Sequence, residues 1–245
     1  MHVKIIFSPS KSQNINAAFF TETTATLFPK MANILTERIL ACSEQEIQKT
    51  FKLSRNKSIE LLENIKIKKP KRIAAIDLFS GTSFRELDTH TYTNEQRVYL
   101  NNNLCILSAL YGILLPLNPV ALYRFDMNNN ILKNTDFKNL YNFWSPSILG
   151  YLKGEPLIIN LASGEYSRMI QGINQKNIIT LHFLMIENGK EKTPSVFSKQ
   201  QRGRMLDHLI KNLIVDPKDI KKYSSDGFSF NKERSDKNNY FFVKE

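Results

Sequence analysis

Charged and hydroxyl-bearing side chains follow three short apolar segments of this chain, each of which has the pattern of a buried strand. The segments are 3–7, 104–109 and 156–161. The polar residues at or beyond their ends are Lys11, Arg124, Asp126, Asn160, Ser163 and Glu165. Open α/β sheets bind ligands at the edge where their strands finish. The pattern therefore predicts one polar cleft at a sheet edge, although each residue taken singly is also typical of turns and helix caps.

Residues of these types are the ones that enzymes use for acid–base chemistry and for holding anions. A lysine serves as a nucleophile or a phosphate clamp, a carboxylate as a general acid or base, and an arginine as an anion clamp. We therefore take Lys11, Asp126 and Glu165 as candidate catalytic residues and Arg124 as a candidate anion clamp. The structural alternative is that both carboxylates are only ion-paired, with Lys11, Arg124 or Arg202 as partners, because an unpaired carboxylate repels phosphate.

The elements that position these residues are strands and helices in alternation. Strands are predicted at 3–7, 72–76, 104–109, 120–126, 156–161, 177–185, 227–230 and 239–243. Helices are predicted at about 30–41, 44–52, 56–65, 93–101, 137–152, 164–171 and 196–213. This order predicts an α+β or mixed α/β fold, in which helices surround a mixed sheet. No linker or internal repeat interrupts it, so we expect a single domain over residues 1–245.

The composition is that of a compact protein rather than a disordered or membrane-spanning one. The chain has 245 residues, of which 42% are hydrophobic. No run approaches the roughly 18 apolar residues that a membrane span requires. The first residues, MHVKII, lack the hydrophobic region of a signal peptide. We therefore expect a cytoplasmic protein that does not bind membranes.

Positive charge is concentrated between residues 49 and 72. The formal net charge of the chain is +11, and this stretch holds nine Lys or Arg against two Glu. Ser43 to Glu46 has the pattern of a capping box, and a break near residue 54 separates two predicted helices. A basic helix-hairpin-helix over about 43–66 would bind phosphate without reading bases, although a solvated surface is the alternative. The candidate DNA-binding residues are Lys49, Lys52, Arg55 and Lys57.

Trp144 and the two cysteines stand in contexts that favour a structural role. Trp144 lies in an aromatic cluster after a helix start, which is typical of the core, and a base-stacking platform is the alternative. Cys105 lies inside an apolar segment, so Cys42 is the better candidate for a reactive thiol. The four histidines show no metal-ligand spacing. We expect neither a metal nor a cofactor.

Seven short motifs follow one another along the chain. They are Ser8-Pro9-Ser10-Lys11, Leu107-Ser-Ala-Leu-Tyr-Gly112, Tyr123-Arg124-Phe-Asp126-Met127, Leu140-Tyr-Asn-Phe-Trp144, Asn160-Leu-Ala-Ser163-Gly-Glu165-Tyr166, Arg202-Gly203-x-Met205 and Ser225-Asp-Gly-Phe228. In this order they resemble the YaaA family of bacterial peroxide stress proteins, and the resemblance runs from residue 3 to about residue 243. The chain departs from the family pattern at Gly81–Leu87, and it has Leu115 and Asn118 where the family usually has an arginine and an aspartate.

The resemblance implies a fold, a partner and a set of cleft residues. The fold is the elongated, barrel-like body of mixed sheet and helices called the cantaloupe fold. The partner is double-stranded DNA, which family members bind through a helix-hairpin-helix and a positively charged cleft. The cleft residues are Ser8, Lys11, Tyr111, Arg124, Asn160, Ser163, Tyr166 and Arg202.

Two functions from different classes follow. In the first, a monomeric protein binds double-stranded DNA without strong sequence specificity and limits iron-linked oxidative DNA damage, as the resemblance implies. In the second, the Lys/Arg/carboxylate cleft is an active site for a nucleotide or for a nucleobase in DNA. The first predicts binding that weakens steeply with salt. The second requires the cleft residues to converge in one pocket.

Overall fold

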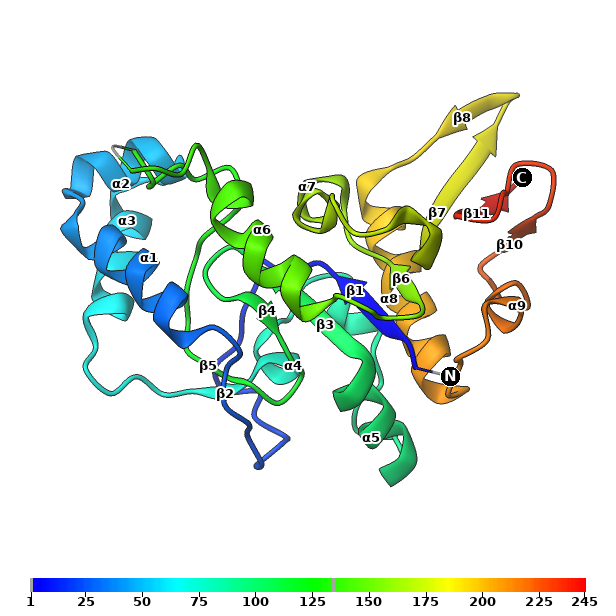
Figure 1. Ribbon diagram of the computed structural model, residues 1–245, viewed down its shortest axis with the longest axis horizontal. Helices are drawn as coiled ribbons and strands as arrows, with labels where there is room; N and C mark the ends of the chain where they lie inside the picture. The colour runs from blue at the N-terminus through cyan, green and yellow to red at the C-terminus, as the bar shows by residue number, and fades with distance from the viewer. Residues whose placement is uncertain (1, 134) are drawn as a thin grey trace.

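The computed structural model describes residues 2–133 and 135–245, and it is a mixed α/β structure with a largely parallel sheet and flanking helices (Figure 1). The strands are β1 Lys4–Phe7, β2 Ile73–Ala74, β3 Leu104–Ser108, β4 Gly112–Leu114, β5 Pro119–Val120, β6 Ile158–Asn160, β7 Ile178–Glu187, β8 Lys190–Lys192, β9 Ser224–Ser225, β10 Phe228–Asn231 and β11 Asn239–Lys244. The helices are α1 Pro29–Ala41, α2 Glu44–Phe51, α3 Arg55–Lys66, α4 Ala75–Leu78, α5 Asn94–Asn103, α6 Leu140–Tyr151, α7 Gly164–Ser167, α8 Ser195–Lys211 and α9 Pro217–Ile220, with short 3₁₀ turns at Phe84–Glu86, Arg168–Ile170 and Gln175–Asn177. Among the described residues, no helix combines the length and apolar character needed to cross a membrane.

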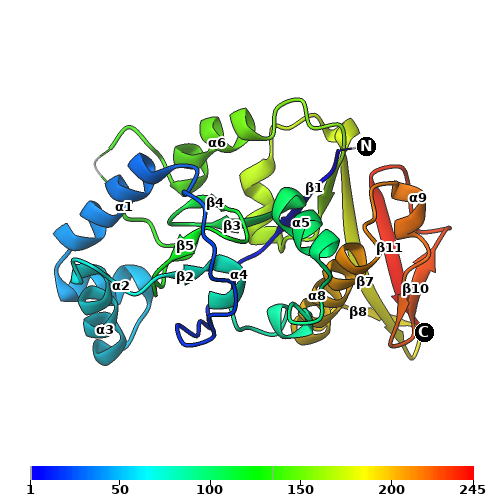
Figure 2. The same ribbon diagram turned by 90° about the horizontal axis from the view of Figure 1, so that it is seen from below.

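The centre of the main sheet is parallel, in the order β3-β1-β6-β7-β11. Antiparallel strands extend it, with β4 beside β3 at one edge and β10 and β9 beyond β11 at the other, while β8 pairs with β7. Within β1, Ile6 lies between Cys105 of β3 and Asn160 of β6. Figure 2 shows α6 on one side of these strands and α8 on the other. The apolar sequence of β1 follows from this arrangement, because both of its faces are covered.

Trp144 packs in the core behind the β3–β4 turn, as predicted. Its side chain has no exposed surface, and its indole N–H donates to the carbonyl oxygen of Ala109 at 2.8 Å. Gly112 lies directly against the ring with a positive φ of +71°, and a β-carbon there would stand 2.6 Å from the indole. Only glycine fits this position without strain. The indole therefore holds the turn between β3 and β4 in place, through its hydrogen bond to Ala109 and its contact with Gly112.

Helices α1, α2 and α3 gather at one end of the molecule, whereas β10 and β11 lie at the opposite end (Figure 1). The predicted capping box opens α2: the Ser43 hydroxyl accepts from the Glu46 N–H, and the Glu46 carboxylate accepts from the Ser43 N–H. At the other end of α2, Lys52 is left-handed with φ of +53°. The chain then starts α3 after Ser54, and α2 packs against α3. Below, the α2–α3 pair denotes residues 44–66.

Two predicted strands are largely wrong. Residues 72–76 form β2 over only two residues, after which α4 begins, and 120–126 pair only at Val120, where β5 meets β2. Beyond β5, side chains rather than a neighbouring strand accept the backbone hydrogen bonds. The N–H of Tyr123 donates to the Gln13 side chain, and the N–H of Asp126 donates to the Asn129 side chain. The short elements β4, β8, β9 and α9 were also not predicted, because two to four residues carry little periodicity.

Candidate functional site

A cavity of about 470 Å³ opens at the carboxyl ends of β1 and β6. Its walls come from residues 7–13 after β1, from loop 81–84, from segment 123–126, from residues 161, 163, 165 and 166 after β6, and from Lys199 and Arg202 of α8. β1 and β6 are neighbours in the sheet, and the chain continues from them in opposite directions: the next strand of this sheet after β1 is β3 on one side, and the next after β6 is β7 on the other. Ligands of open α/β sheets bind at such a reversal of strand order. The cavity therefore lies where open α/β sheets of other proteins bind their ligands.

Short hydrogen bonds tie the two strand exits together. The Ser8 hydroxyl accepts from the N–H of Ser163 at 2.8 Å, and their hydroxyls are 3.2 Å apart. Asn160, at the end of β6, accepts from the N–H of Ala162 at 3.0 Å and donates to the hydroxyl of Ser167 at 3.1 Å. Its second amide N–H donates to the Thr180 hydroxyl at 3.3 Å, and the side chain does not line the cavity. Asn160 thus orders the turn that carries Ser163 into the cleft.

Lys11 and Asp126 form an ion pair in the cavity wall, with Nζ 2.7 Å from Oδ2. The Lys11 side chain is 62% exposed, whereas that of Asp126 is 20% exposed. The lysine thus reaches over a half-buried carboxylate from the solvent side. Since the two charges neutralise one another, neither contributes to the net charge of the cleft. The paired carboxylate is the arrangement that the structural alternative predicted for Asp126.

Glu165 is the second carboxyl group of the cavity, and it is not ion-paired within the described residues. Its Oε1 atom is buried and has no hydrogen-bond partner in the part of the chain that the structure describes. Burial raises the pKa of Glu165 and the Asp126 charge raises it further, while Lys11 and the backbone N–H of Met127 oppose the shift. The carboxyl group is thereby biased toward its protonated form, in which it can donate a hydrogen bond.

Three cations line the cavity without a carboxylate partner among the described residues: Arg124, Lys199 and Arg202. Lys199 is exposed at the mouth, whereas Arg202 is half-buried. The Nε of Arg202 is buried and has no hydrogen-bond partner in the described structure, and burial lowers the pKa of its guanidinium. Positive charge therefore predominates in the cleft once Lys11 and Asp126 have cancelled.

Aromatic rings form the apolar part of the wall. Tyr123 is nearly buried, its hydroxyl lies 2.8 Å from that of Ser108, and burial raises its pKa above its ordinary value. Phe7 meets Phe84 edge to face at 5.3 Å between ring centroids. Tyr111 packs edge to face on Tyr123 at 5.4 Å but lies behind it, outside the cavity lining. Tyr111 therefore supports the wall and does not line the cavity.

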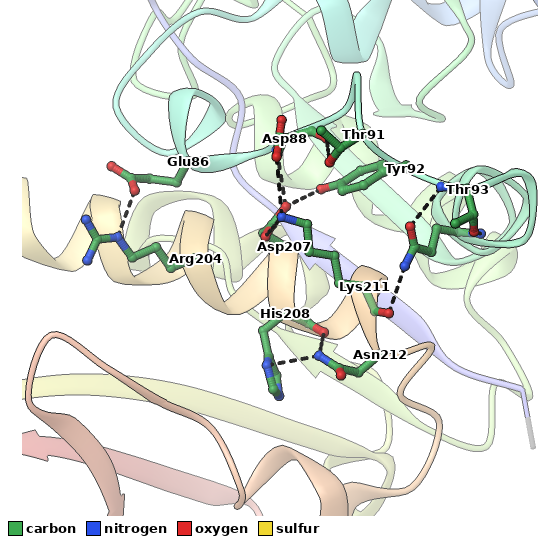
Figure 3. Close-up of polar contacts among 11 residues, drawn as sticks. Glu86, Asp88, Thr91, Tyr92, Thr93, Arg204, Asp207, His208, Lys211 and Asn212 are labelled. Carbon is green, nitrogen blue, oxygen red and sulfur yellow. Dashed lines mark hydrogen bonds and ion pairs between the residues drawn. The ribbon is translucent and has the colours of Figure 1, made fainter.

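The wall contributed by α8 is fixed to the loop that follows residue 84 by the polar network of Figure 3. Asp207 accepts from the Tyr92 hydroxyl at 2.7 Å and from the Asp88 N–H at 3.2 Å, and it lies 3.0 Å from the Lys211 amine. One turn earlier, Arg204 pairs with Glu86 at 2.7 Å. These bonds hold the helix bearing Lys199 and Arg202 in place.

Two glycines allow the walls to come this close. A β-carbon at Gly203 of α8 would stand 2.1 Å from the carbonyl oxygen of Ser83, and one at Gly81 would stand 2.0 Å from the Ser10 hydroxyl oxygen. Loop 81–84 thus packs between α8 and the chain leaving β1. Larger residues at either glycine would push a wall of the cavity outward.

A second hollow of about 160 Å³ connects the cleft to α3. It shares Lys11, Gln13, Tyr123 and Arg124 with the larger cavity, and its other wall is formed by one face of α3 with Lys57, Glu60, Leu61 and Asn64. The basic α2–α3 pair and the strand-end cleft, which are far apart in sequence, are thus neighbours on one surface.

The nine basic residues between 49 and 72 are all exposed. They are Lys49, Lys52, Arg55, Lys57, Lys66, Lys68, Lys69, Lys71 and Arg72. Within the described residues only Arg55 has a carboxylate partner, Glu44 of α2, with Nε and Oε1 3.2 Å apart. The charge of the remaining eight is available to solvent or to an anionic partner.

The match to known proteins covers almost the whole chain. Residues 3–234 match the family described as peroxide stress protein YaaA. The chain belongs to this family. It is 37% identical to a UPF0246 protein of Fusobacterium nucleatum, with 99% of each chain covered, and 34% identical to a UPF0246 protein of Malacoplasma penetrans with the same coverage. A UPF0246 protein of Crocosphaera subtropica is 30% identical, over 98% of this chain and 99% of the relative.

The sequence positions that depart from the YaaA family pattern divide between the cleft and the core. Gly81 to Phe84 line the cavity, whereas Leu115 and Asn118 do not. Asn118 is fully buried, accepts from the N–H of Leu115 at 2.8 Å and donates to the carbonyl oxygens of Thr24 and Ala25. The neutral amide of Asn118 therefore has its hydrogen-bond partners within the core, which is a structural role.

The cleft brings together most of the residues that the sequence singled out. Those in its lining are Ser8, Lys11, Arg124, Asp126, Ser163, Glu165, Tyr166 and Arg202, and those outside it are Asn160 and Tyr111. Lining residues that were not predicted as part of the cleft include Ser10, Gln13, Thr82, Ser83, Tyr123 and Lys199. Lys199 had a usable signal, because it precedes Arg202 by three residues and so shares a helix face with it.

Neither cysteine of this YaaA family member has the environment of a reactive thiol. Cys105 is fully buried, and burial raises its pKa to about 12. Cys42 is partly buried, its thiol donates to the carbonyl oxygen of Arg38, and burial together with the Glu46 charge raises its pKa. Peroxide attacks thiolates rather than thiols, so both side chains are disfavoured as peroxide targets at neutral pH.

Proposed function

We propose that this peroxide stress protein binds double-stranded DNA without strong sequence specificity, through the α2–α3 pair, and helps to limit iron-linked oxidative DNA damage. The description of its family supports the peroxide role. The resemblance to YaaA proteins implies the DNA partner and the link to iron. Because the apolar core is contiguous from β1 to β11, we further propose that the chain acts as one domain.

The observation that carries the DNA proposal is the row of exposed cations with no internal partner. Surface lysines that lack a carboxylate neighbour neutralise phosphates and release condensed counterions, and this term dominates sequence-independent binding. Lys49, Lys52 and Lys57 meet this condition within the described residues. Arg55 does not, because it already pairs with Glu44. The lysines are therefore better probes of the interface than Arg55.

The start of α3 adds a second phosphate-binding feature. Ser54, at the N-cap, makes no side-chain capping bond, so the first N–H groups of a helix of 12 residues lack that partner. Lys57 lies in the first turn of this helix and in the wall of the second hollow. Free N–H groups and the positive end of the helix dipole favour a phosphate at this position. None of these contacts reads a base, which is why we propose weak sequence preference.

The test is a titration of a fluorescent duplex at several salt concentrations with charge-reversed variants. Lys52→Glu combined with Lys57→Glu should weaken binding by about tenfold or more at low salt and reduce the salt slope by about two, since each phosphate contact contributes close to one. The matched control is Lys232→Glu with Lys237→Glu, which changes the net charge equally in the exposed segment between β10 and β11, at the opposite end of the molecule.

Duplexes of unrelated sequence should lose affinity to the same extent. Equal losses in the two double variants would show that only net charge matters and would remove the α2–α3 pair from the DNA surface. Unchanged binding in both would place the DNA surface elsewhere, and a wild-type protein that does not bind the duplex would contradict the proposal that DNA is the partner.

A further inference from the structure

We propose that the strand-end cleft is a binding site for a single nucleotide, whose phosphate lies on Arg202, Lys199 and Arg124 and whose base lies against the aromatic wall. Binding of a free nucleotide would be independent of the function proposed above. Binding of a nucleotide that is still part of a DNA strand rests on that function, because the α2–α3 pair would hold the strand. The chemistry of the site is the same for both sources.

The charge of the cavity calls for an anion. Lys11 and Asp126 cancel in their 2.7 Å pair, which leaves three cations facing one further carboxyl group, Glu165. Burial and the Asp126 charge raise the pKa of Glu165. A phosphate group is the anion that matches such a cluster, because arginine and lysine together bind several of its oxygens.

Two side chains of the cavity lining each carry a buried polar atom that has no hydrogen-bond partner in the described structure. The atoms are Oε1 of Glu165 and Nε of Arg202, and the two residues come from different elements. Buried polar groups in folded proteins are nearly always hydrogen-bonded, and exceptions mark sites with a role. A change of side-chain rotamer on binding, which is common, would bring both atoms within reach of an acceptor and a donor on one ligand. A bare phosphate has acceptors for Arg202, and the nucleoside part supplies the group that reaches Glu165.

The rest of the lining suits a flat, partly polar ring system. Aromatic side chains form the apolar wall, namely Phe7, Phe84, Tyr123, Phe125 and Tyr166. Hydroxyl groups at Ser10, Thr82 and Ser83 are interspersed with them. Sites for small molecules are mostly apolar with a few placed polar groups and measure about 300–1,000 Å³. The cavity of about 470 Å³ falls in this range and is large enough for one nucleotide.

The route to the cleft passes the DNA surface proposed above. The second hollow has Lys57 on one wall and Lys11 and Arg124 on the other, and the last two also line the cleft. A strand held by its phosphates on α3 would therefore have the cleft beside it. Enzymes and sensors that act on single bases extrude a nucleotide into such a pocket. The same path is open to a free nucleotide from solvent.

The first arm of the test uses free ligands. Thymidine 5′-monophosphate and deoxyguanosine 5′-monophosphate are titrated calorimetrically into the full chain, with inorganic phosphate and the two nucleosides as controls. We expect the nucleotides to bind at least tenfold more tightly than phosphate or nucleoside. Lys199→Glu, at an exposed position, should weaken nucleotide binding about tenfold without loss of melting temperature, and Arg202→Met should weaken it further. Lys52→Glu with Lys57→Glu should leave it unchanged.

The second arm uses a duplex with one 2-aminopurine opposite a mismatched base. Extrusion of the base should raise its fluorescence with the wild-type chain and not with Lys199→Glu at saturating protein. Binding of free nucleotide without this rise identifies the free nucleotide as the source, and the rise without free binding identifies the DNA strand. The proposal would be overturned if inorganic phosphate bound as tightly as the nucleotides, or if neither arm gave a response. Either result would count against the nucleotide site even if Lys52 and Lys57 are shown to bind the duplex. Loss of the duplex role alone would leave the first arm intact.

Discussion

The α2–α3 pair and the strand-end cleft are both positively charged, yet they hold their charges in opposite ways. The lysines of the helix pair are exposed, and Lys49, Lys52 and Lys57 have no carboxylate partner within the described residues. In the cleft, Arg202 is half-buried and Asp126 is paired with Lys11. Exposed charges bind phosphates anywhere along a strand and are screened by salt. Partly buried charges recognise one shaped ligand, because a poor fit leaves them desolvated and unpaired.

The cleft therefore depends on rigid surroundings in a way that the helix pair does not. Trp144→Ala should cost about 3–5 kcal/mol of stability, since a fully buried indole and its hydrogen bond to Ala109 are both lost. Thermal and urea unfolding measure this cost. The matched control is Phe137→Ala, at an aromatic side chain that is 40% exposed and should give a much smaller change. A stable Trp144→Ala protein that only lost ligand binding would contradict the core assignment.

A smaller loss of stability is expected when the polar network between α8 and the preceding loop, which supports the cleft, is weakened. Tyr92→Phe removes the hydroxyl that donates to Asp207 at 2.7 Å and should cost about 1 kcal/mol of stability. Because this network holds the wall that carries Arg202, nucleotide binding should weaken as well, while duplex affinity should stay at its wild-type value. Tyr240→Phe, which alters a phenol beside β10 rather than beside the cleft, serves as the control. Equal losses of nucleotide and duplex binding in Tyr92→Phe would show that the two regions are not independent.

Each region contains one glutamate whose pKa is shifted, and the two shifts have opposite signs. The capping-box bonds from Ser43 lower the pKa of Glu46, so its contribution to stability is present above its unfolded pKa and is lost as pH falls through its folded pKa. Burial raises the pKa of Glu165, so the folded chain binds the proton more tightly and stability declines as pH rises from the unfolded pKa through the folded one.

Near neutral pH, Glu46→Gln should therefore lower the melting temperature slightly, whereas Glu165→Gln should leave it unchanged or raise it. Melting curves of both variants between about pH 4 and pH 8, which span the ordinary glutamate range and the interval above it, measure the difference. A clear loss of stability in Glu165→Gln at neutral pH would mean that the carboxylate is a structural residue. A gain would fit a residue retained for its function.

Local sequence was enough to predict the part of the cleft that is formed by residues at the ends of β1 and β6. The apolar runs before Lys11 and Ser163 mark two strands, and a strand that turns polar must leave the sheet at that point. Their lateral pairing then brings both exits to one edge. The helix pair was equally visible, because the capping box at Ser43 and the break near Ser54 are local signals.

The remaining wall depends on contacts between residues far apart in the chain. Gly203 touches Ser83 through long-range packing, and no local pattern places α8 against loop 81–84. The predicted strand at 120–126 pairs at Val120 alone among the described residues, with the two-residue strand β2. That run instead lines the cleft, where Arg124 and Asp126 are held by turns and side-chain bonds. The proximity of Lys57 to the cleft arises from the same tertiary packing.

The most direct test of a division of labour between the helix pair and the cleft is survival of peroxide challenge by cells that carry a cleft variant with intact DNA affinity. Lys11→Ala combined with Glu165→Gln alters the cleft and leaves the lysines of the helix pair in place. We predict that this protein binds duplex DNA nearly as tightly as the wild type but no longer protects the cells. Protection that instead falls in proportion to duplex affinity, in this variant and in Lys52→Glu with Lys57→Glu alike, would contradict the account.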